Sequence, residues 1–397
     1  MNKLIFSSSA IGVLYSVMNM LLIPNLSVEL NSAYKASSVM SAAMIASLII
    51  TPVIGYICDK YHQSKRIIEL MFCIGAISLT CIYFFSGEIA AFFGFLIVFV
   101  SFSILTPFSA IAGIVSKDTE KDRNFGMIMG MVNFTVFIAS FFIGSFNENK
   151  VMYLFFSLYV LFMVIPILKI KLNFKKSNDK HLYEDKEKRN FYHYVKNIEK
   201  PLIIFFLIQF SMWFVIGGIM PFLTSFLSTN LSMSIGEAAF WLGLSTLISS
   251  ISSFSSGKIC KYIRQKKLFM ISISVLTFLI IIFNCCYELI LNSNIFIGIF
   301  FLLASSIFLG FFYSLGGSII SVLSNKKDQG KAFGINSFFM ILGQAISVAL
   351  SGFVIEKQGY SNYWILMLVL TCIAFVLSIF FVTLKNTKEV NYAKSNV

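Results

Sequence analysis

Long uncharged segments alternate with short charged ones along the whole chain, and this alternation predicts its architecture. Twelve such segments occur, and each is long enough, or nearly so, to supply the roughly 20 apolar residues that an α-helix needs to cross a bilayer. A solvated helix face would carry charge every few residues, so these segments do not fit a soluble fold. They lie at residues 4–28, 36–58, 70–87, 89–116, 124–147, 151–168, 202–236, 238–257, 268–287, 289–325, 332–355 and 358–384. We therefore expect an all-α polytopic membrane protein with twelve transmembrane helices.

The distribution of Lys and Arg among the connecting loops predicts which side each loop faces. Of the 31 basic residues, 28 lie in alternate loops on one side, and only Lys35, Lys150 and Lys357 lie on the other. The positive-inside rule places the crowded side, and with it both termini, in the cytoplasm. Each external loop then carries one acid. These acids are Glu29, Glu88, Glu148, Glu237, Glu288 and Glu356.

This orientation also accounts for the net charge of +13, because basic loops are attracted to the anionic lipids of the cytoplasmic face. We expect the lipid bilayer, and no nucleic acid, as the partner of these charges. The first uncharged segment is preceded only by Lys3 and contains no small-residue cleavage site. It therefore predicts a retained helix and not a removed signal peptide.

Several kinds of chemistry find no support in the sequence. The seven cysteines lie within or at the ends of predicted spans and form no C-x-x-C motif, so we interpret them as small packing residues. The three histidines are scattered over cytoplasmic loops and predict no metal site. There is no Gly-rich phosphate loop ending in Lys-Ser/Thr and no nucleophile–base constellation. We expect no cofactor, no ATP hydrolysis and no enzymatic activity.

The composition changes once, in a long polar segment on the cytoplasmic side that divides six spans from six. The predicted organisation is an N-terminal six-helix bundle at 1–169, a cytoplasmic linker at 170–200, a C-terminal six-helix bundle at 201–386 and a tail at 387–397. Within the linker, residues 184–200 have a weak apolar stripe that is compatible with a short surface helix.

An internal repeat supports two related halves. The loop after the second span and the loop after the eighth share Gly, Ile, Cys, Gln and Lys at an offset of 202, beginning at Gly55 and Gly257. A second echo aligns Ser116 through Gly126 with Ser324 through Gly334 at an offset of 208. Two parallel six-helix halves are a transporter architecture, with the substrate bound near the middle of the membrane between them.

The loop after the second span resembles the signature of the major facilitator superfamily, which runs roughly Gly-x-x-x-Asp-Arg/Lys-x-Gly-Arg-Arg/Lys. Gly55, Asp59 and Lys60 match it, while His62 replaces the second Gly and the basic pair is displaced to Lys65-Arg66. The resemblance covers the whole chain. It implies a secondary transporter in which this loop closes the inner side, with Gly55, Asp59, Lys60 and Arg66 as gating residues.

Within that superfamily the chain looks most like the bacterial sugar efflux transporters. The similarity is carried by Pro24-Asn25-Leu26-Ser27, by Thr106-Pro107 in the fourth span and by the Phe-Gly entry into the fifth. It implies a bacterial inner-membrane monomer that exports a small-molecule substrate, with an antiporter that exchanges the substrate for protons as one form of coupling. Two marks of proton-coupled drug exporters are missing: a buried arginine in the fourth span and a Gly-Pro pair at the end of the fifth.

No charged residue lies deep within any predicted span, so a central cavity would be built from neutral polar and aromatic side chains. Taken together, these side chains suit a neutral hydroxylated ligand. For any one of them the alternative is a hydrogen bond between helices with no substrate involved. The cavity candidates are Tyr15, Asn19, Asn133, Thr135, Gln209, Trp213, Tyr313, Asn336 and Gln344.

Three functional hypotheses follow. The leading one is an alternating-access transporter that exports a sugar or another small neutral polar solute. The second is a proton-coupled multidrug exporter, which would be expected to have a membrane-embedded acid. The third is a membrane receptor or scaffold, for which the short loops offer little surface. If protons drive transport, Glu29, Glu69 and Glu237 are the candidates for coupling.

Overall fold

The computed structural model describes residues 1–22, 26, 30, 33–61, 63–145, 150–170, 191–230, 233–287, 295–325 and 328–384. Every regular element in this part of the chain is a helix, and twelve helical stretches are long and apolar enough to cross a membrane. The predicted fold class and number of spans are therefore confirmed. Glu29, His62 and most of the predicted linker, residues 171–190, lie outside the described residues.

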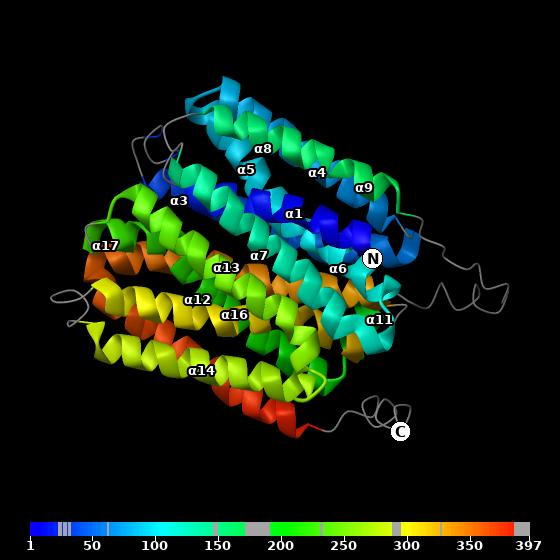
Figure 1. Cartoon of the computed structure of the whole chain (residues 1–397). Coiled ribbons are helices and arrows are strands. Elements are labelled where there is room, and N and C mark those ends of the chain that lie inside the picture. Colours follow the sequence, from blue (N-terminus) through cyan, green and yellow to red (C-terminus); the bar gives the residue numbers. More distant parts are fainter. Residues whose placement is uncertain are drawn as a thin grey trace, which may run out of the picture.

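The helices of the two halves follow one another in the expected order (Figure 1). The first half consists of α1 (Asn2–Ser16), η1 (Val17–Leu22), α3 (Ala33–Tyr61), α4 (Ser64–Phe84), α5 (Gly87–Ser103), α6 (Leu105–Val115), η2 (Asp118–Glu120), α7 (Lys121–Ser145), α8 (Val151–Phe162) and α9 (Val164–Leu168). The short α11 (Phe191–Lys196) lies in the predicted linker. The second half consists of α12 (Lys200–Asn230), α13 (Ile235–Ile259), α14 (Gln265–Cys285), α16 (Ile295–Leu323) and α17 (Gln329–Thr383).

Proline explains why two of the spans are divided. A proline has no N–H, so the carbonyl four residues earlier loses its helical donor. In the fourth span α5 ends at Ser103, four residues before Pro107. In the sixth span α8 ends at Phe162, four residues before Pro166. Each of these spans therefore consists of two helical segments joined at a kink.

The element α17 supplies two spans, Gln329–Ile355 and Lys357–Thr383. The chain reverses between them near Gly359, whose φ of 78° is in the left-handed region that glycine tolerates best. We refer to the two parts as the first and second arms of α17. The first arm packs against α3 and α12, and the second against α12 and α14.

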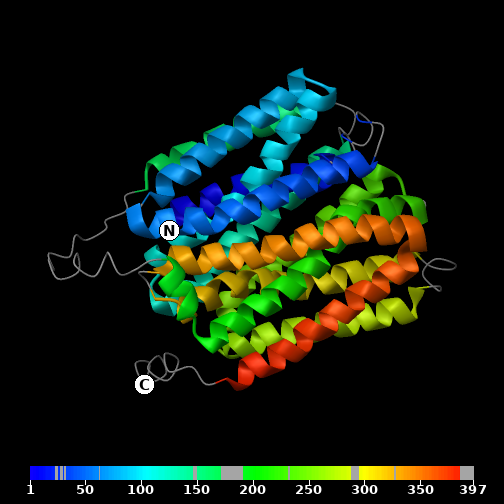
Figure 2. The ribbon, with the colours of Figure 1, turned by 180° about the vertical axis from the view of Figure 1, so that it is seen from behind.

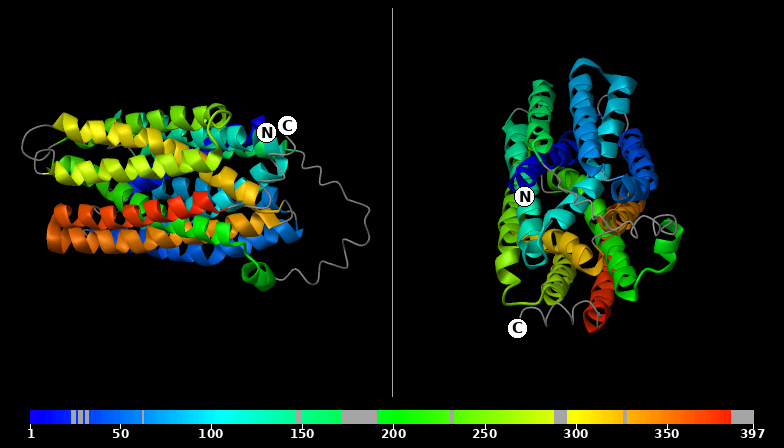
Figure 3. Two further views of the ribbon diagram at one scale, coloured as in Figure 1. Left: turned by 90° about the horizontal axis from the view of Figure 1, so that it is seen from below. Right: turned by 90° about the vertical axis from the view of Figure 1, so that its right-hand side faces the viewer.

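Viewed along the helix axes, the helices of the first half lie on one side of the molecule and those of the second half on the other (Figure 3, right). Two long helix pairs join these sides, α3 with α17 and α7 with α13. Figure 2 shows the first pair, with the orange first arm of α17 beside the blue α3. The site described below lies between these two pairs.

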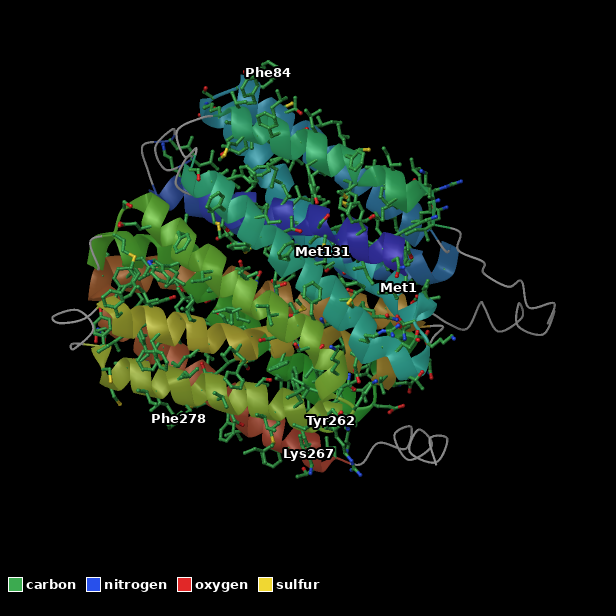
Figure 4. The ribbon with its side chains drawn as sticks, viewed as in Figure 1. Met1, Phe84, Met131, Tyr262, Lys267 and Phe278 are labelled. Atoms are coloured by element: carbon green, nitrogen blue, oxygen red, sulfur yellow. The ribbon has the colours of Figure 1, made fainter. Side chains whose placement is uncertain are left out.

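One end of the helix bundle concentrates basic residues. We call it the basic end, and it is where α1 begins, α3 ends, and α7 and α17 begin. Lys3 and Lys65 donate there to carbonyl oxygens at the end of the sixth span, Lys169 O at 2.9 Å and Leu168 O at 2.6 Å. Met1 and Lys267 lie at this end as well (Figure 4).

The outer surface between the two ends is apolar. Phe84 and Phe278 project from the rim of the bundle and are 68% and 59% exposed, respectively (Figure 4). Such side chains would be costly in water, but they match the hydrocarbon core of a bilayer. The exposed aromatic surface thus agrees with a multi-pass membrane protein.

Candidate substrate cavity and basic-end gate

A cavity of about 190 Å³ lies between the two halves. Its wall is built from α1, η1, α3, α5, α6, α7, α12, α13, α16 and the first arm of α17, so both halves contribute. None of its lining residues carries a formal charge. The cavity is therefore a neutral compartment, as the absence of charge within the spans suggests.

Eight of the nine predicted cavity residues line this space. They are Tyr15, Asn19, Asn133, Gln209, Trp213, Tyr313, Asn336 and Gln344. Thr135 is not part of the lining, because it lies where α7 crosses α1. A Cβ on Gly12 of α1 would come within 2.9 Å of Thr135 Cβ, and the Thr135 hydroxyl donates to Met131 O at 2.8 Å. Whether the eight lining residues bind substrate stays a prediction.

The donor groups of these side chains are largely used within the protein. Trp213 Nε1 donates to Gln209 Oε1 at 2.9 Å, one turn away on α12. Asn133 Nδ2 donates to Ser249 Oγ at 3.1 Å, which ties α7 to α13 across the two halves. Asn19 donates to its own helix, to Tyr15 O at 3.0 Å. Several of the amide N–H groups are therefore explained by hydrogen bonds within the protein, without a substrate.

Three polar atoms of the lining are buried and have no hydrogen-bond partner. They are Tyr15 Oη, Asn336 Oδ1 and Gln344 Oε1. Asn336 uses its Nδ2 on Met340 Sδ at 2.8 Å and leaves its carbonyl oxygen free. Because an unmade hydrogen bond of a buried polar group costs about 1–3 kcal/mol, these atoms favour a ligand that carries hydrogen-bond donors.

Most of the remaining wall is apolar, which the sequence analysis missed. Trp213 and Tyr313 lie with their ring centroids 5.5 Å apart, and Tyr15 contacts Phe102 edge-on at 6.0 Å. Thioether side chains also contribute, and they are flexible, polarizable and able to adapt to different ligand shapes. These methionines are Met18, Met40, Met44, Met129, Met220 and Met340. The i, i+4 spacing of Met40 and Met44 was the one sequence signal that both occupy a single helix face.

Asp59 connects the two halves at the basic end. Its Oδ1 accepts from the backbone N–H of Gly330 and its Oδ2 from that of Lys331, both at 2.8 Å. These amides belong to the first turn of α17, where the helix dipole favours an anion. The helices approach closely here, since a Cβ on Gly55 would lie 2.3 Å from Gly330 O. We call this contact of α3 with α17 the first corner.

The linker helix α11 adds to the first corner. Lys331 Nζ lies 5.6 Å from the centre of the Tyr194 ring and pairs with Asp328 at 2.9 Å. Burial, together with the nearby Asp328 and Asp59, raises the pKa of Tyr194, so its hydroxyl stays protonated. The segment between the halves therefore contacts the start of α17 directly.

A second corner lies where α13 ends and α7 begins. Asp122 accepts from the Ser318 hydroxyl on α16 and from the Cys260 thiol. Burial raises the pKa of that thiol and the Asp122 carboxylate raises it further, which keeps the thiol as a donor. Lys121 Nζ donates to Ser321 O at 2.6 Å, and a Cβ on Gly257 would lie 2.5 Å from Arg123 Cα. The sequence analysis missed Asp122, although the second echo aligns it with Gly330.

The remaining predicted residues have local roles. Lys60 Nζ lies 5.3 Å from the centre of the Tyr56 ring, and Arg66 is exposed. Glu69 lies 3.9 Å from Lys65. Glu237 accepts from Ser234 N at 2.8 Å and completes the capping box that starts α13. A coupling role for Glu69 or Glu237 stays a prediction.

The comparisons with known proteins agree with this architecture. Two solved structures with a similar fold are a bacterial homologue of the iron transporter ferroportin in an outward-facing state and the human organic anion transporter MFSD10 (TETRAN). The first has a TM-score of 0.74 and 12% identity over 96% of this chain and 99% of its own. The second has a TM-score of 0.74 and 12% identity over 95% and 98%. At this identity the similarity concerns the fold alone.

No curated protein matches the chain. The family model described as Major Facilitator Superfamily matches residues 4–191 and 205–396, which together are nearly the whole sequence and are divided between the two halves. With this match, twelve spans and a neutral cavity between two halves, the chain belongs to the Major Facilitator Superfamily of membrane transporters.

Proposed function

We propose that this secondary transporter exports a small neutral solute with hydroxyl or amide groups and an apolar face, of which a sugar is the leading candidate. One observation carries the proposal. The cavity contains three unpartnered hydrogen-bonding atoms, on Tyr15, Asn336 and Gln344, but no charged side chain. Donors on the solute would complete these hydrogen bonds, and the aromatic rings would cover its apolar face.

The size of the cavity supports the same class of cargo. Its volume of about 190 Å³ is below the roughly 300–1,000 Å³ of pockets for drug-sized ligands. An organic phosphate would require Arg or Lys in the wall, and a cationic drug would favour a carboxylate. Neither occurs among the lining residues.

The proposed mechanism is alternating access, in which the two halves rock about the cavity. The positive-inside rule places the basic end in the cytoplasm, and the resemblance to bacterial sugar efflux transporters supports a bacterial inner membrane. The two corners hold this end closed while the solute leaves on the opposite side. Opening then requires Asp59 to leave the amides of Gly330 and Lys331, which makes that contact a latch.

A panel of radiolabelled neutral sugars and lipophilic cations in inside-out vesicles tests the proposal. We expect ATP-independent accumulation of at least one sugar and of no cation. Asn336→Leu and Gln344→Leu each remove an acceptor, and we expect each to raise the apparent KM for that sugar about tenfold, as loss of one hydrogen bond of about 1.4 kcal/mol would do. Thr135→Val is the matched control, because Thr135 is buried on α7 but lies outside the cavity lining. Transport of cations alone would overturn the proposal.

A second candidate, a multidrug exporter, is favoured by the six methionines of the wall. Flexible thioethers are common on surfaces that accept ligands of many shapes. This candidate predicts that cells gain resistance to several unrelated lipophilic compounds with no change in sugar flux. Resistance confined to sugars and their analogues would exclude it.

A further inference from the structure

Two buried hydroxyl groups near the middle of the first half lack the partner that such groups normally have. Serine and threonine on membrane helices usually donate to the carbonyl three or four residues earlier. Ser47 and Ser101 do so, at 2.9 Å and 2.7 Å. Thr51 Oγ1 and Ser103 Oγ have no hydrogen-bond partner, although both residues are fully buried. Their burial would be costly unless something else satisfies them.

The two hydroxyls lie at the same level of neighbouring helices. Ser47 on α3 also donates to Phe99 O on α5, at 3.2 Å. Both helices run toward the basic end, and Thr51 and Ser103 each follow these residues by four positions. Residues four apart share a helix face. Thr51 and Ser103 therefore face the same α3–α5 boundary one turn closer to the basic end.

Proline releases backbone oxygen atoms at this boundary. Pro107 has no N–H, so Ser103 O loses its helical donor at the point where α5 ends. Pro52 does the same to Leu48 O within α3. Ile104 between α5 and α6 keeps helical dihedrals, so each proline releases a single carbonyl oxygen within a continuous span. A carbonyl oxygen released in this way is a hard ligand of the kind that alkali and alkaline-earth cations prefer.

The second half closes this group of oxygen atoms. Thr106, one turn after Ser103, donates to Ser337 Oγ on α17 at 2.8 Å. The backbone of α17 is also near α3, because a Cβ on Gly334 would lie 3.0 Å from Thr51 O. The α3–α5 boundary and the Thr106–Ser337 contact therefore adjoin one another, one helical turn apart, where α17 meets the first half.

We propose that Thr51, Ser103, Thr106 and Ser337 form a Na⁺ site at this junction. The donor set consists of neutral hydroxyl and carbonyl oxygens, which suit a hard cation. A single charge fits better than a double one, because these neutral oxygens offer no carboxylate and charge inside a membrane is costly. Transition metals prefer imidazole or thiolate, and the described residues contain no cluster of three or more His, Cys, Asp or Glu side chains that could hold a metal ion.

Na⁺ bound at this site could drive transport, although the neutral cavity contains no charged group for coupling. In this respect the inference rests on the proposed function. Ser337 belongs to the second half and also lines the cavity. Na⁺ held between α17 and the first half would therefore favour the state in which the basic end is closed. By linkage, closing this end would raise the affinity for Na⁺ by the same factor.

Thermal unfolding of the purified full-length protein tests the site without any transport substrate. Na⁺, K⁺ and choline chlorides are compared at equal ionic strength. We expect a saturable rise in Tm with Na⁺ only. Thr51→Val and Ser103→Ala each remove one oxygen ligand and are expected to raise the half-saturating Na⁺ concentration at least about tenfold.

Two matched controls preserve the site. Ser101→Ala lies on the same helix as Ser103, and Thr371→Val lies on the second arm of α17. Both residues are fully buried, but their hydroxyls have ordinary partners, Ile97 O and Met367 O. We expect both controls to respond to Na⁺ like the wild type.

Equal responses of the wild type to Na⁺, K⁺ and choline would overturn the site, and so would an unchanged Na⁺ response in both Thr51→Val and Ser103→Ala. The vesicle panel separates this failure from failure of the proposed function. If the protein exports a sugar independently of Na⁺ and does not bind Na⁺, only the Na⁺ site is rejected. Selective Na⁺ binding that the variants weaken, without sugar export, supports the site and rejects only the proposed cargo.

Discussion

The two corners at the basic end show how one architecture is held by two different chemistries. At the first corner the acid is on the end of α3 and accepts from two backbone amides of α17. At the second corner the residue that aligns with Asp59 is Lys261, and the acid, Asp122, is at the start of α7. It accepts from a hydroxyl and a thiol. The repeat has therefore kept the position of the contact while the acid changed sides.

Both corners retain a close approach of two backbones. Gly55 allows α3 to touch Gly330, and Gly257 allows α13 to touch Arg123. The difference lies in the strength of the polar contact. At the first corner the carboxylate accepts from two backbone amides at the start of α17, whereas one of the two side-chain donors to Asp122 is a thiol, which is a weak donor. We infer that glycine sets the geometry of both corners and that the first corner contributes more to closure.

The largest effect is expected from filling the glycine contacts. Gly55→Ala and Gly257→Ala place a Cβ 2.3 Å and 2.5 Å from backbone atoms of the partner helix, so the helices have to separate. We expect each variant to reach the membrane but to transport the exported panel solute at least about 100-fold more slowly, since overpacking typically costs 1–3 kcal/mol or more. Vesicle transport normalised to membrane-inserted protein measures this.

Gly352→Ala is the matched control for these two variants. It lies on the first arm of α17, and the nearest atom to its added Cβ is Phe222 Cζ at 3.8 Å. That is ordinary van der Waals contact, so transport should stay within about twofold of the wild type. Normal transport by Gly55→Ala would show that the first corner does not need the close approach.

Loss of the charge at the first corner should have the next largest effect. Asp59→Asn keeps the size of the side chain but leaves a single acceptor oxygen. One of the two charge-assisted hydrogen bonds, each of about 1.5–3 kcal/mol, becomes a neutral one, and the other is lost because the amide NH2 group faces a backbone N–H donor. We expect transport to fall about 10- to 100-fold while the variant remains in the membrane. Glu120→Gln is the control, because its ion pair with Arg123 at 3.4 Å is exposed and contributes little. An Asp59→Asn protein that transports normally would contradict the latch.

Loss of the charge at the second corner should have a smaller effect. We expect Asp122→Asn to lower the transport rate about three- to tenfold. Ser318→Ala removes the hydroxyl that donates to Asp122, so the two changes should not add when combined. The free-energy changes of Asp59→Asn and Asp122→Asn should add, because the corners share no residue. Initial transport rates of the single and double variants measure both couplings. An effect of Asp122→Asn larger than that of Asp59→Asn would reverse the proposed ranking of the corners.

Local patterns in the sequence predicted the fold, and the family resemblance drew attention to Gly55 and Asp59 of the first corner. Uncharged segments define spans, and Gly55 has an echo at Gly257, although Lys261 stands where Asp59 would align. The kinks also follow from sequence, since α5 and α8 end four residues before Pro107 and Pro166. Helical geometry would have separated Asn133 from Thr135 as well, because residues two apart do not share a face.

The rest of the site depends on which atoms meet after packing. Nothing local indicates that Ser47 has a partner and that Thr51, on the next turn, has none. The contact of Asp122 with Ser318 depends on where α16 packs against α7, which the sequence does not indicate. The methionine wall likewise combines residues from five helical elements, each unremarkable within its own span.

The smallest effect is expected at the end of α13 that lies opposite the second corner. It tests whether residues away from the corners take part in transport. Glu237 caps this helix through Ser234, and Gln can make the same capping box. We therefore expect Glu237→Gln to leave transport unchanged, including its response to a proton ionophore. Ser234→Ala removes the cap itself and should lower Tm by no more than a few degrees without affecting coupling. If Glu237→Gln transported but lost its sensitivity to the ionophore, the acid would act in coupling and not only as a cap. The end of α13 that carries Glu237 would then have a role in transport, and not only the end that forms the second corner.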